Sequence, residues 1–342
     1  MTAPTVVISA WETISPLGWN AEEHARNLRK PAAGEPGPRT VAGFDVRQVL
    51  GPRGTRAMCR GTGLAVATTG QLLARVGLDK ERRPAGSDDW IGVVLATSDM
   101  VQPLSSFNTD SWTRGRPYDV DPAQAPSLLM NVHSGHSAIW HRLRGPNSTI
   151  CGSHLGSLLA LSYARRLLHG GHARAVLCGA VEEHSEVRAA YTAARAGAEA
   201  ATALGEGCVA FLLESAATAK RPPLAEVVAL NFGFAADPDD TGTALTAALH
   251  RALETAGAQA AEVSAVALGP GGADTEVAAI RHTFGDVRLL SASADAVGDT
   301  ESVSGAFQIA EILADPRCAQ SLVAATSTDS EGRVGCALLR VF

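Results

Sequence analysis

The alternation of short β-branched runs with alanine- and leucine-rich stretches is the feature that most constrains the fold of this chain. Runs such as "TVVISA" (5–10) and "WIGVVLATS" (90–98) are typical of strands. The stretch from Ser153 to His169 carries apolar residues around much of a helix surface and ends at Gly170-Gly171, as expected for a largely buried helix. Strands and helices that alternate in this way predict a layered α/β fold.

This strand–helix series occurs twice along the 342 residues. The first series closes with "GCVAFLLES" (207–215), and "KRPP" (220–223) is the best candidate linker. In the second series we expect helices over 242–256, near 275–284 and near 304–314, and a final hairpin across "TDSEGR" (328–333). Residues 100–125 are expected to form a loop. The sequence thus predicts an N-terminal half, 1–219, and a similar C-terminal half, 220–342, in one compact unit.

Composition and charge exclude several classes of function. The net charge is −6, the chain has only three lysines, and it has no lysine or arginine run, so no nucleic-acid partner is expected. No apolar run approaches the ~18 residues that a membrane helix needs, and no signal peptide is evident, so we expect no membrane association and a cytoplasmic protein. The six cysteines include no CxxC pair, and His133, His136 and His141 have no obvious carboxylate partner. We therefore expect no metal and no other cofactor.

Four stretches in the first half, taken in order, resemble the β-ketoacyl synthase family of decarboxylating condensing enzymes. They are an opening strand with a Ser-Pro-Leu-Gly turn, a Met-Asn segment followed by Gly-Pro-Asn, a Gly-x-Ala strand and a Gly-Glu-Gly strand, at residues 6–18, 126–149, 168–185 and 204–215. The resemblance implies the thiolase fold of the thiolase superfamily: two similar halves in α-β-α-β-α layers.

The resemblance also locates the positions at which the family carries its catalytic groups. The family's cysteine lies seven residues after the Asn of Gly-Pro-Asn, and here that count from Asn147 reaches His154. Its two histidines correspond to Leu268 and Asp299. The family's lysine corresponds to Ala294 or Asp295, and its Gly-Phe-Gly-Gly loop is replaced by residues 330–333. The resemblance therefore implies no catalytic residue and no route to condensation.

Two alternatives keep a different function open. Cys151 would be the nucleophile if the loop before it were three residues shorter, and the imidazole of His154 can attack a thioester, so an autonomous acyltransferase or decarboxylase is one alternative. A homodimeric acyl-binding scaffold without catalysis is the other.

The combination of a family fold with a vacated site resembles one subclass, the chain-length factors of type II polyketide synthases. The resemblance implies a heterodimer with an active ketosynthase, contact with acyl carrier protein through that complex, and no independent activity. It also implies that residues 100–115 line the tunnel for the growing acyl chain. We expect Leu104, Phe107, Asn108 and Trp112 to be tunnel or interface residues.

Overall fold

The computed structural model describes residues 4–342 except 31–36, 99, 117, 197–202 and 271–273. It contains a mixed sheet of ten strands in the order β3-β2-β4-β5-β1-β6-β10-β9-β7-β8. The strands of the first half are β1 Val6–Ile14, β2 Ile91–Ala96, β3 Asn147–Ile150, β4 Ala175–Glu182 and β5 Gly207–Ser215. Those of the second half are β6 Ala225–Phe234, β7 Val263–Ala267, β8 Arg288–Leu290, β9 Leu322–Thr328 and β10 Arg333–Val341.

The two halves repeat one topology. Read from the outer edge of the sheet towards its centre, the first half has the order third, second, fourth, fifth, first strand. The second half, read from its own outer edge and numbered from β6, has the same order. The strand directions agree as well: β2 is parallel to β3 and β4, as β7 is to β8 and β9, and the remaining pairs within each half are antiparallel. The halves meet at β1 and β6, which share only two residue pairs.

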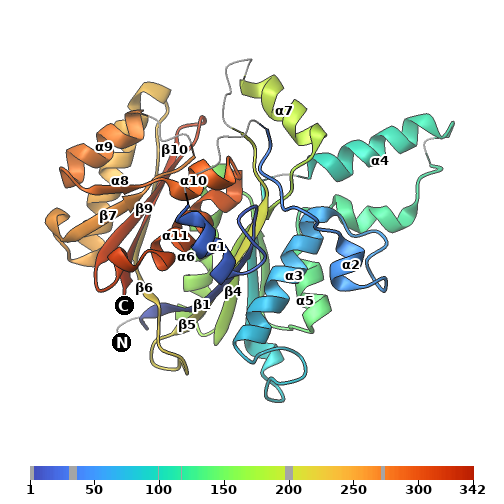
Figure 1. The fold of residues 1–342 in the computed structure, drawn as a ribbon, viewed down its shortest axis with the longest axis horizontal. Coiled ribbons are helices and arrows are strands. Elements are labelled where there is room, and N and C mark those ends of the chain that lie inside the picture. The colour runs from blue at the N-terminus through green and yellow to red at the C-terminus, as the bar shows by residue number, and fades with distance from the viewer. Residues whose placement is uncertain (1–3, 31–36, 99, 117, 197–202, 271–273) are drawn as a thin grey trace.

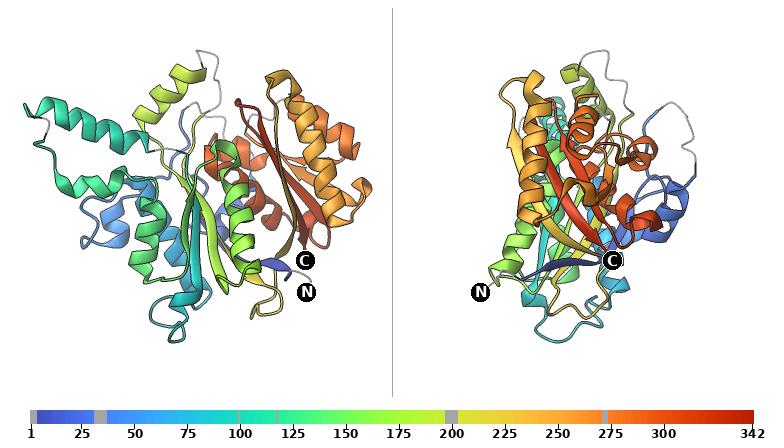
Figure 2. Two further views of the ribbon diagram at one scale, coloured as in Figure 1. Left: turned by 180° about the vertical axis from the view of Figure 1, so that it is seen from behind. Right: turned by 90° about the vertical axis from the view of Figure 1, so that its left-hand side faces the viewer.

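Helices cover the outer faces of both halves of the sheet and fill the space between the two halves (Figures 1 and 2). The helices are α1 Ala21–Leu28, α2 Val46–Leu50, α3 Arg60–Arg75, α4 Val101–Thr113, α5 Val132–His141, α6 Gly156–His169, α7 Glu186–Ala196, α8 Thr241–Ala256, α9 Asp274–Phe284, α10 Ala292–Val297 and α11 Ser304–Ala314. No helix in the described part of the chain is both long and apolar enough to cross a membrane.

Three hydrophobic cores separate the layers. The central core joins Leu158 and Leu161 of α6 and Ile309 of α11 to strands of both halves. A second core packs α3 on the outer face of the first half's sheet, and a third packs α8 and α9 on that of the second half. The layers are therefore α-β-α-β-α, and the predicted thiolase fold is confirmed.

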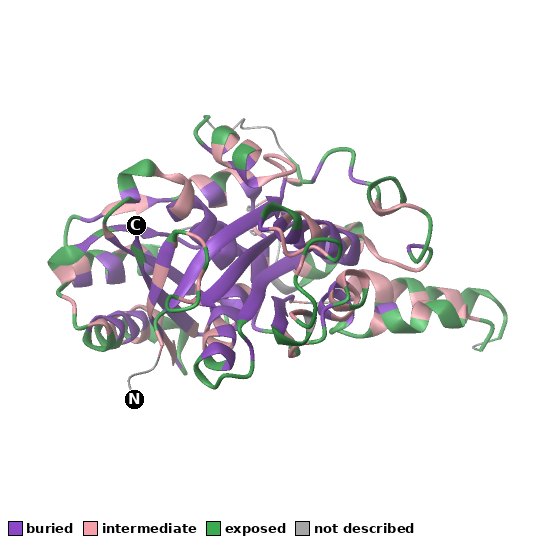
Figure 3. Cartoon of the chain, turned by 90° about the horizontal axis from the view of Figure 1, so that it is seen from below, coloured by how far each residue is buried: buried purple, intermediate pink, exposed green. Residues whose placement is uncertain are grey.

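The prediction that residues 100–125 form a loop is wrong. Residues Val101–Thr113 form helix α4, and Pro122–Leu128 form a 3₁₀ turn, η2. Helix α4 buries none of its side chains, so its sequence lacks the apolar periodicity by which a helix is normally predicted. It projects from the first half at the right of Figure 1, and Figure 3 shows this arm almost entirely in the colours of intermediate and exposed residues.

Candidate functional site

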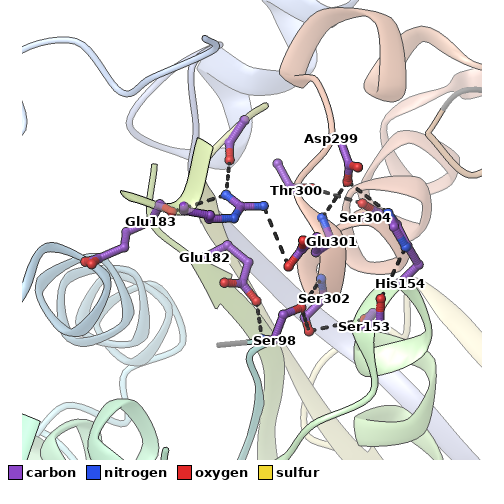
Figure 4. Close-up of polar contacts among 12 residues, drawn as sticks. Ser98, Ser153, His154, Glu182, Glu183, Asp299, Thr300, Glu301, Ser302 and Ser304 are labelled. Atoms are coloured by element: carbon purple, nitrogen blue, oxygen red, sulfur yellow. Dashed lines mark hydrogen bonds and ion pairs between the residues drawn. The ribbon is translucent and has the colours of Figure 1, made fainter. Parts of the chain in front are cut away.

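The candidate site lies where the carboxyl ends of β2, β3 and β4 meet a loop of the second half. Because these three strands are parallel neighbours, the residues that follow them come to the same edge of the sheet. Ser98 follows β2, residues 151–154 follow β3, and Glu182 ends β4. The facing loop is 298–303, which leads into α11. Figure 4 shows these side chains converging from both halves.

His154 and Asp299, which are 145 residues apart, contact each other directly in this site. The His154 Nε2 lies 3.0 Å from the Asp299 Oδ1, and the same oxygen accepts a hydrogen bond of 2.8 Å from the Glu301 amide. The two side chains are only 22% and 19% exposed. The position that the family resemblance matches to the nucleophile thus forms an ion pair with the position that it matches to a histidine.

The electrostatic environment favours the charged form of both partners. Burial acts to lower the pKa of His154, but the hydrogen bond and charge of Asp299, with the charges of Glu301 and Asp329, outweigh it and raise that pKa. For Asp299, burial acts to raise the pKa, and the hydrogen bond and charge of His154 outweigh it and lower that pKa. The pairing favours the protonated imidazole, and in that form His154 has no free nitrogen lone pair with which to attack a thioester.

The shifts predict how stability depends on pH. The raised pKa of His154 gives stabilisation that is fully present below about pH 6.5, its ordinary value, and is lost as the pH rises through the folded-state pKa. The lowered pKa of Asp299 gives stabilisation that is present above about pH 3.8 and is lost as the pH falls through its folded-state pKa. We expect His154→Gln to lower the free energy of unfolding by about 1 kcal/mol near pH 5.5, and by less near pH 8.5.

Urea unfolding of both proteins at the two pH values measures this difference. The matched control is His250→Gln, because His250 is exposed on α8. An equal effect of His154→Gln at both pH values would contradict the predicted ion pair.

A backbone connection between the halves holds Asp299 in place. Its amide donates to the Ala203 carbonyl and its carbonyl accepts from the Gly205 amide, both at 2.8 Å. A Cβ on Gly205 would lie only 1.8 Å from the Val297 carbonyl oxygen, so the close approach of the two segments requires glycine there. The Gly-Glu-Gly stretch therefore helps to position the second half's contribution to the site.

Serines from both halves lie beside the ion pair. The Ser98 and Ser302 hydroxyls are 2.7 Å apart, and the Ser302 amide donates to the Ser98 hydroxyl at 3.2 Å. The Ser302 hydroxyl donates to the Ser153 carbonyl at 3.2 Å, and Glu182 accepts from the Ser98 amide. The three bonds of Ser302 join the first half to the second half next to the ion pair.

Two residues beside the ion pair have left-handed backbone conformations although neither is glycine. Ser153 has φ +47° and Glu301 has φ +43°. Each begins a 3₁₀ turn, η3 Ser153–Leu155 and η6 Glu301–Val303, that continues into a central helix, α6 and α11 respectively. Such conformations cost about 1 kcal/mol or more and persist only where the surrounding structure imposes them.

Cys151 lies outside this network, directly after β3. Its side chain is exposed, and its Sγ lies 3.7 Å from the Met130 Sδ. Burial of part of the thiol, followed by the negative charge of Glu182, raises the pKa of Cys151. A nucleophilic cysteine needs a lowered pKa, so this environment does not favour a thiolate.

The other positions of the expected site lie nearby. Leu268 is buried at the end of β7, and with Ala294 and Thr300 it lines a cavity of about 10 Å³. Asp295 lies one residue further along α10. Residues 330–333 form part of a tight turn between β9 and β10, in which Arg333 pairs with Asp329 and Glu331. Gly271 and Gly272, which follow Leu268 closely in the sequence, lie outside the described residues.

The three histidines that were considered as metal ligands lie in different environments. His133 Nδ1 lies 2.9 Å from the Thr62 hydroxyl, and His141 Nε2 lies 2.9 Å from the Val66 carbonyl oxygen. Burial lowers the pKa of His136, which stands between them on α5. Among the described residues, no three His, Cys, Asp or Glu side chains are grouped so that they could hold a metal ion.

The four expected tunnel residues lie on one face of α4. Because a helix turns 100° per residue, Leu104, Phe107, Asn108 and Trp112 fall within an arc of about 140°. Leu104 and Trp112 are 45% and 85% exposed, so the chain itself does not cover this face. Sequence reasoning proposed the residues but not the helix that aligns them.

Sequence reasoning missed Arg188 as part of the site. Arg188 extends from α7, is 1% exposed, and donates to the carbonyls of Gly205 at 2.9 Å and Glu183 at 3.1 Å. Its Nη2 lies 3.9 Å from the Glu301 carboxylate. No sequence pattern indicates this role, because an arginine in the first turn of a helix normally faces solvent.

Comparison with known proteins identifies the family. Residues 9–219 match the model of the β-ketoacyl synthase N-terminal domain. The 3-oxoacyl-[acyl-carrier-protein] synthase 2 of Vibrio cholerae is 27% identical over 296 residues, which cover 78% of this chain and 70% of the relative. The chain therefore belongs to the β-ketoacyl synthase family.

Solved structures give more detail about which members it resembles. The ishigamide ketosynthase/chain length factor structure includes a chain that is 36% identical, with a TM-score of 0.87 and coverage of 99% of both chains. The complex of a ketosynthase (ApeO) with its chain length factor (ApeC) from Xenorhabdus doucetiae contains a chain that is 18% identical, with a TM-score of 0.76 and coverage of 99% of this chain and 98% of that one. At that identity the second match shows the fold alone.

Proposed function

We propose that this chain is a chain-length-factor-like, non-catalytic subunit of a type II polyketide synthase, which pairs with an active ketosynthase and shapes the tunnel for the growing acyl chain. The observation that carries the proposal is the His154–Asp299 ion pair. Condensation by this family needs a thiolate and two histidines. At the matching positions this chain has an imidazole bound to a carboxylate and a buried leucine, Leu268.

The similarity to the ishigamide ketosynthase/chain length factor structure supports the same conclusion. A subunit related to its partner can keep the family's pairing surface while its own site loses catalytic groups. Acyl carrier protein then meets this chain only within the complex, because the partner holds the acyl chain.

An exposed apolar surface supports the pairing. We name it the α4 surface and define it as Leu104, Phe107 and Trp112 of α4 with Tyr118, Leu129, Met130 and Ile139, all of which except the half-buried Phe107 are strongly exposed. Large apolar side chains that are exposed on one part of a molecule are candidates for a protein–protein interface. β3, the last strand at this end of the sheet, contacts α5, the helix that carries Ile139.

Co-expression with a ketosynthase that retains its cysteine and both histidines tests the proposal. The expected result is a complex with one copy of each chain, whose condensation activity requires both chains. The isolated chain, incubated with acyl-loaded carrier protein, should show no mass increase. An acyl adduct on His154 or Cys151 would instead support the autonomous acyltransferase, and a homodimer that ignores the ketosynthase would support the scaffold.

Phe107→Ala tests the tunnel directly. If the ring of Phe107 closes the tunnel, its removal enlarges the space for the acyl chain, and the product should lengthen by about one two-carbon unit. Mass spectrometry of the products of the reconstituted pair measures this change. Gln102→Ala, on the opposite side of α4, is the matched control. Unchanged products for Ala variants of Leu104, Phe107, Asn108 and Trp112 would exclude this segment as the tunnel wall.

A further inference from the structure

A second cavity lies at the other end of the first half's sheet, away from His154. It has a volume of about 520 Å³ and opens beside the first residues of β2 and β4, whereas the candidate site lies beyond the last residues of these strands. The volume falls in the range of about 300–1,000 Å³ that is typical of small-molecule sites. Its apolar wall is formed by Leu78, Pro84, Trp90 and Ile91. No residue of the candidate site takes part in it.

The charged side chains of this cavity fall into two groups. Arg221 and Glu214 lie 3.7 Å apart, and each has a further partner, since Arg221 donates to the Val76 carbonyl and Glu214 accepts from the Ser9 hydroxyl at 2.5 Å. Their charges largely cancel.

The remaining cations of the cavity give it a net positive charge. Arg174 and Lys220 are both exposed at its rim. The Arg174 guanidinium lies 4.7 Å from the centre of the Trp90 ring, so the tryptophan holds one positive charge directly above the apolar wall. An occupant that satisfies both features needs an apolar body and an anionic end.

We propose that this cavity binds a small amphipathic carboxylate. Its hydrocarbon part lies along Trp90, Leu78 and Ile91, and its carboxylate lies between Arg174 and Lys220. Burial of the hydrocarbon supplies most of the binding free energy, and the two cations select an anion over a neutral or cationic molecule of the same shape. The inference does not depend on the proposed function, because it uses none of the same residues.

Isothermal titration calorimetry of the full chain with decanoate tests the proposal. We expect saturable binding of one decanoate per chain, and at least about tenfold weaker binding of decyltrimethylammonium, which has the same tail and the opposite charge. The double variant Arg174→Ala/Lys220→Ala should weaken decanoate binding by about tenfold or more, since both side chains are exposed and the fold does not need them.

Arg53→Ala is the matched control, because Arg53 is an exposed arginine that does not line the cavity. It should bind decanoate as the unaltered chain does. Three results would overturn the proposal. They are no saturable binding of decanoate, equal affinities for decanoate and decyltrimethylammonium, or an unchanged decanoate affinity in the double variant. The last of these would place the bound decanoate on another apolar area, such as the α4 surface.

Discussion

The double variant Leu104→Asp/Trp112→Asp is expected to weaken the binding of a ketosynthase partner by about a hundredfold, or ~3 kcal/mol. Both side chains lie on the α4 surface, and Trp112 is 85% exposed in the isolated chain. At the centre of an interface, an exposed tryptophan of this kind normally provides a large share of the binding energy. Aspartates at positions 104 and 112 would have to lose their hydration on binding without a compensating partner.

The control for this prediction is the double variant Ser106→Asp/Thr109→Asp. It adds the same two charges to the same helix, but at exposed positions that lie outside the arc of Leu104 and Trp112. Calorimetric titration of the ketosynthase into each variant measures the affinities, and thermal unfolding shows whether the fold is unchanged. Affinity loss of equal size in both double variants, or in neither, would contradict the assignment of the α4 surface as the interface.

Glu206→Ala is expected to lower the free energy of unfolding by about 3–5 kcal/mol. Glu206 is fully buried and accepts four hydrogen bonds. Two come from the Arg60 guanidinium at 2.8 and 2.6 Å, and the others come from the amides of Val41 at 2.7 Å and His184 at 3.0 Å. Removal of the carboxylate would leave these donors, one of them a charged side chain that is only 31% exposed, without their acceptor.

Urea unfolding measures the effect, and two further variants interpret it. Glu206→Gln keeps the shape of the side chain and one acceptor oxygen, so it should fall between the unaltered chain and Glu206→Ala. Glu226→Ala is the control, since Glu226 lies in the second half and forms a single ion pair of 3.7 Å with Arg340 near the surface; its loss should be below about 1 kcal/mol. A loss of under about 1 kcal/mol for Glu206→Ala would show that this network contributes little.

Strand and helix patterns predicted the buried elements of this chain well. The strand at 207–215 and the helix at 304–314 have the bounds that their apolar patterns suggested. Both are buried along most of their length, so the spacing of their hydrophobic residues follows the faces that contact the core. α4 is the opposite case: this chain buries none of its side chains, and a helix without buried residues leaves no such pattern.

The candidate site was only partly predictable for a similar reason. The family resemblance located His154 and Asp299, but nothing in the sequence indicates that they form an ion pair. That contact depends on the hydrogen bonds between Asp299 and residues 203–205, which bring the halves together. Arg188 was missed because its burial depends on the same junction.

The repeated strand order relates the turn before His154 to a turn in the second half. A local two-fold relation between the halves makes the start of α6 equivalent to the start of α11. Ser153 and Glu301 occupy corresponding places, and both adopt the same uncommon backbone conformation. The sharp turn before His154 therefore belongs to the architecture that both halves share. Its backbone conformation is no evidence that His154 is a reactive residue.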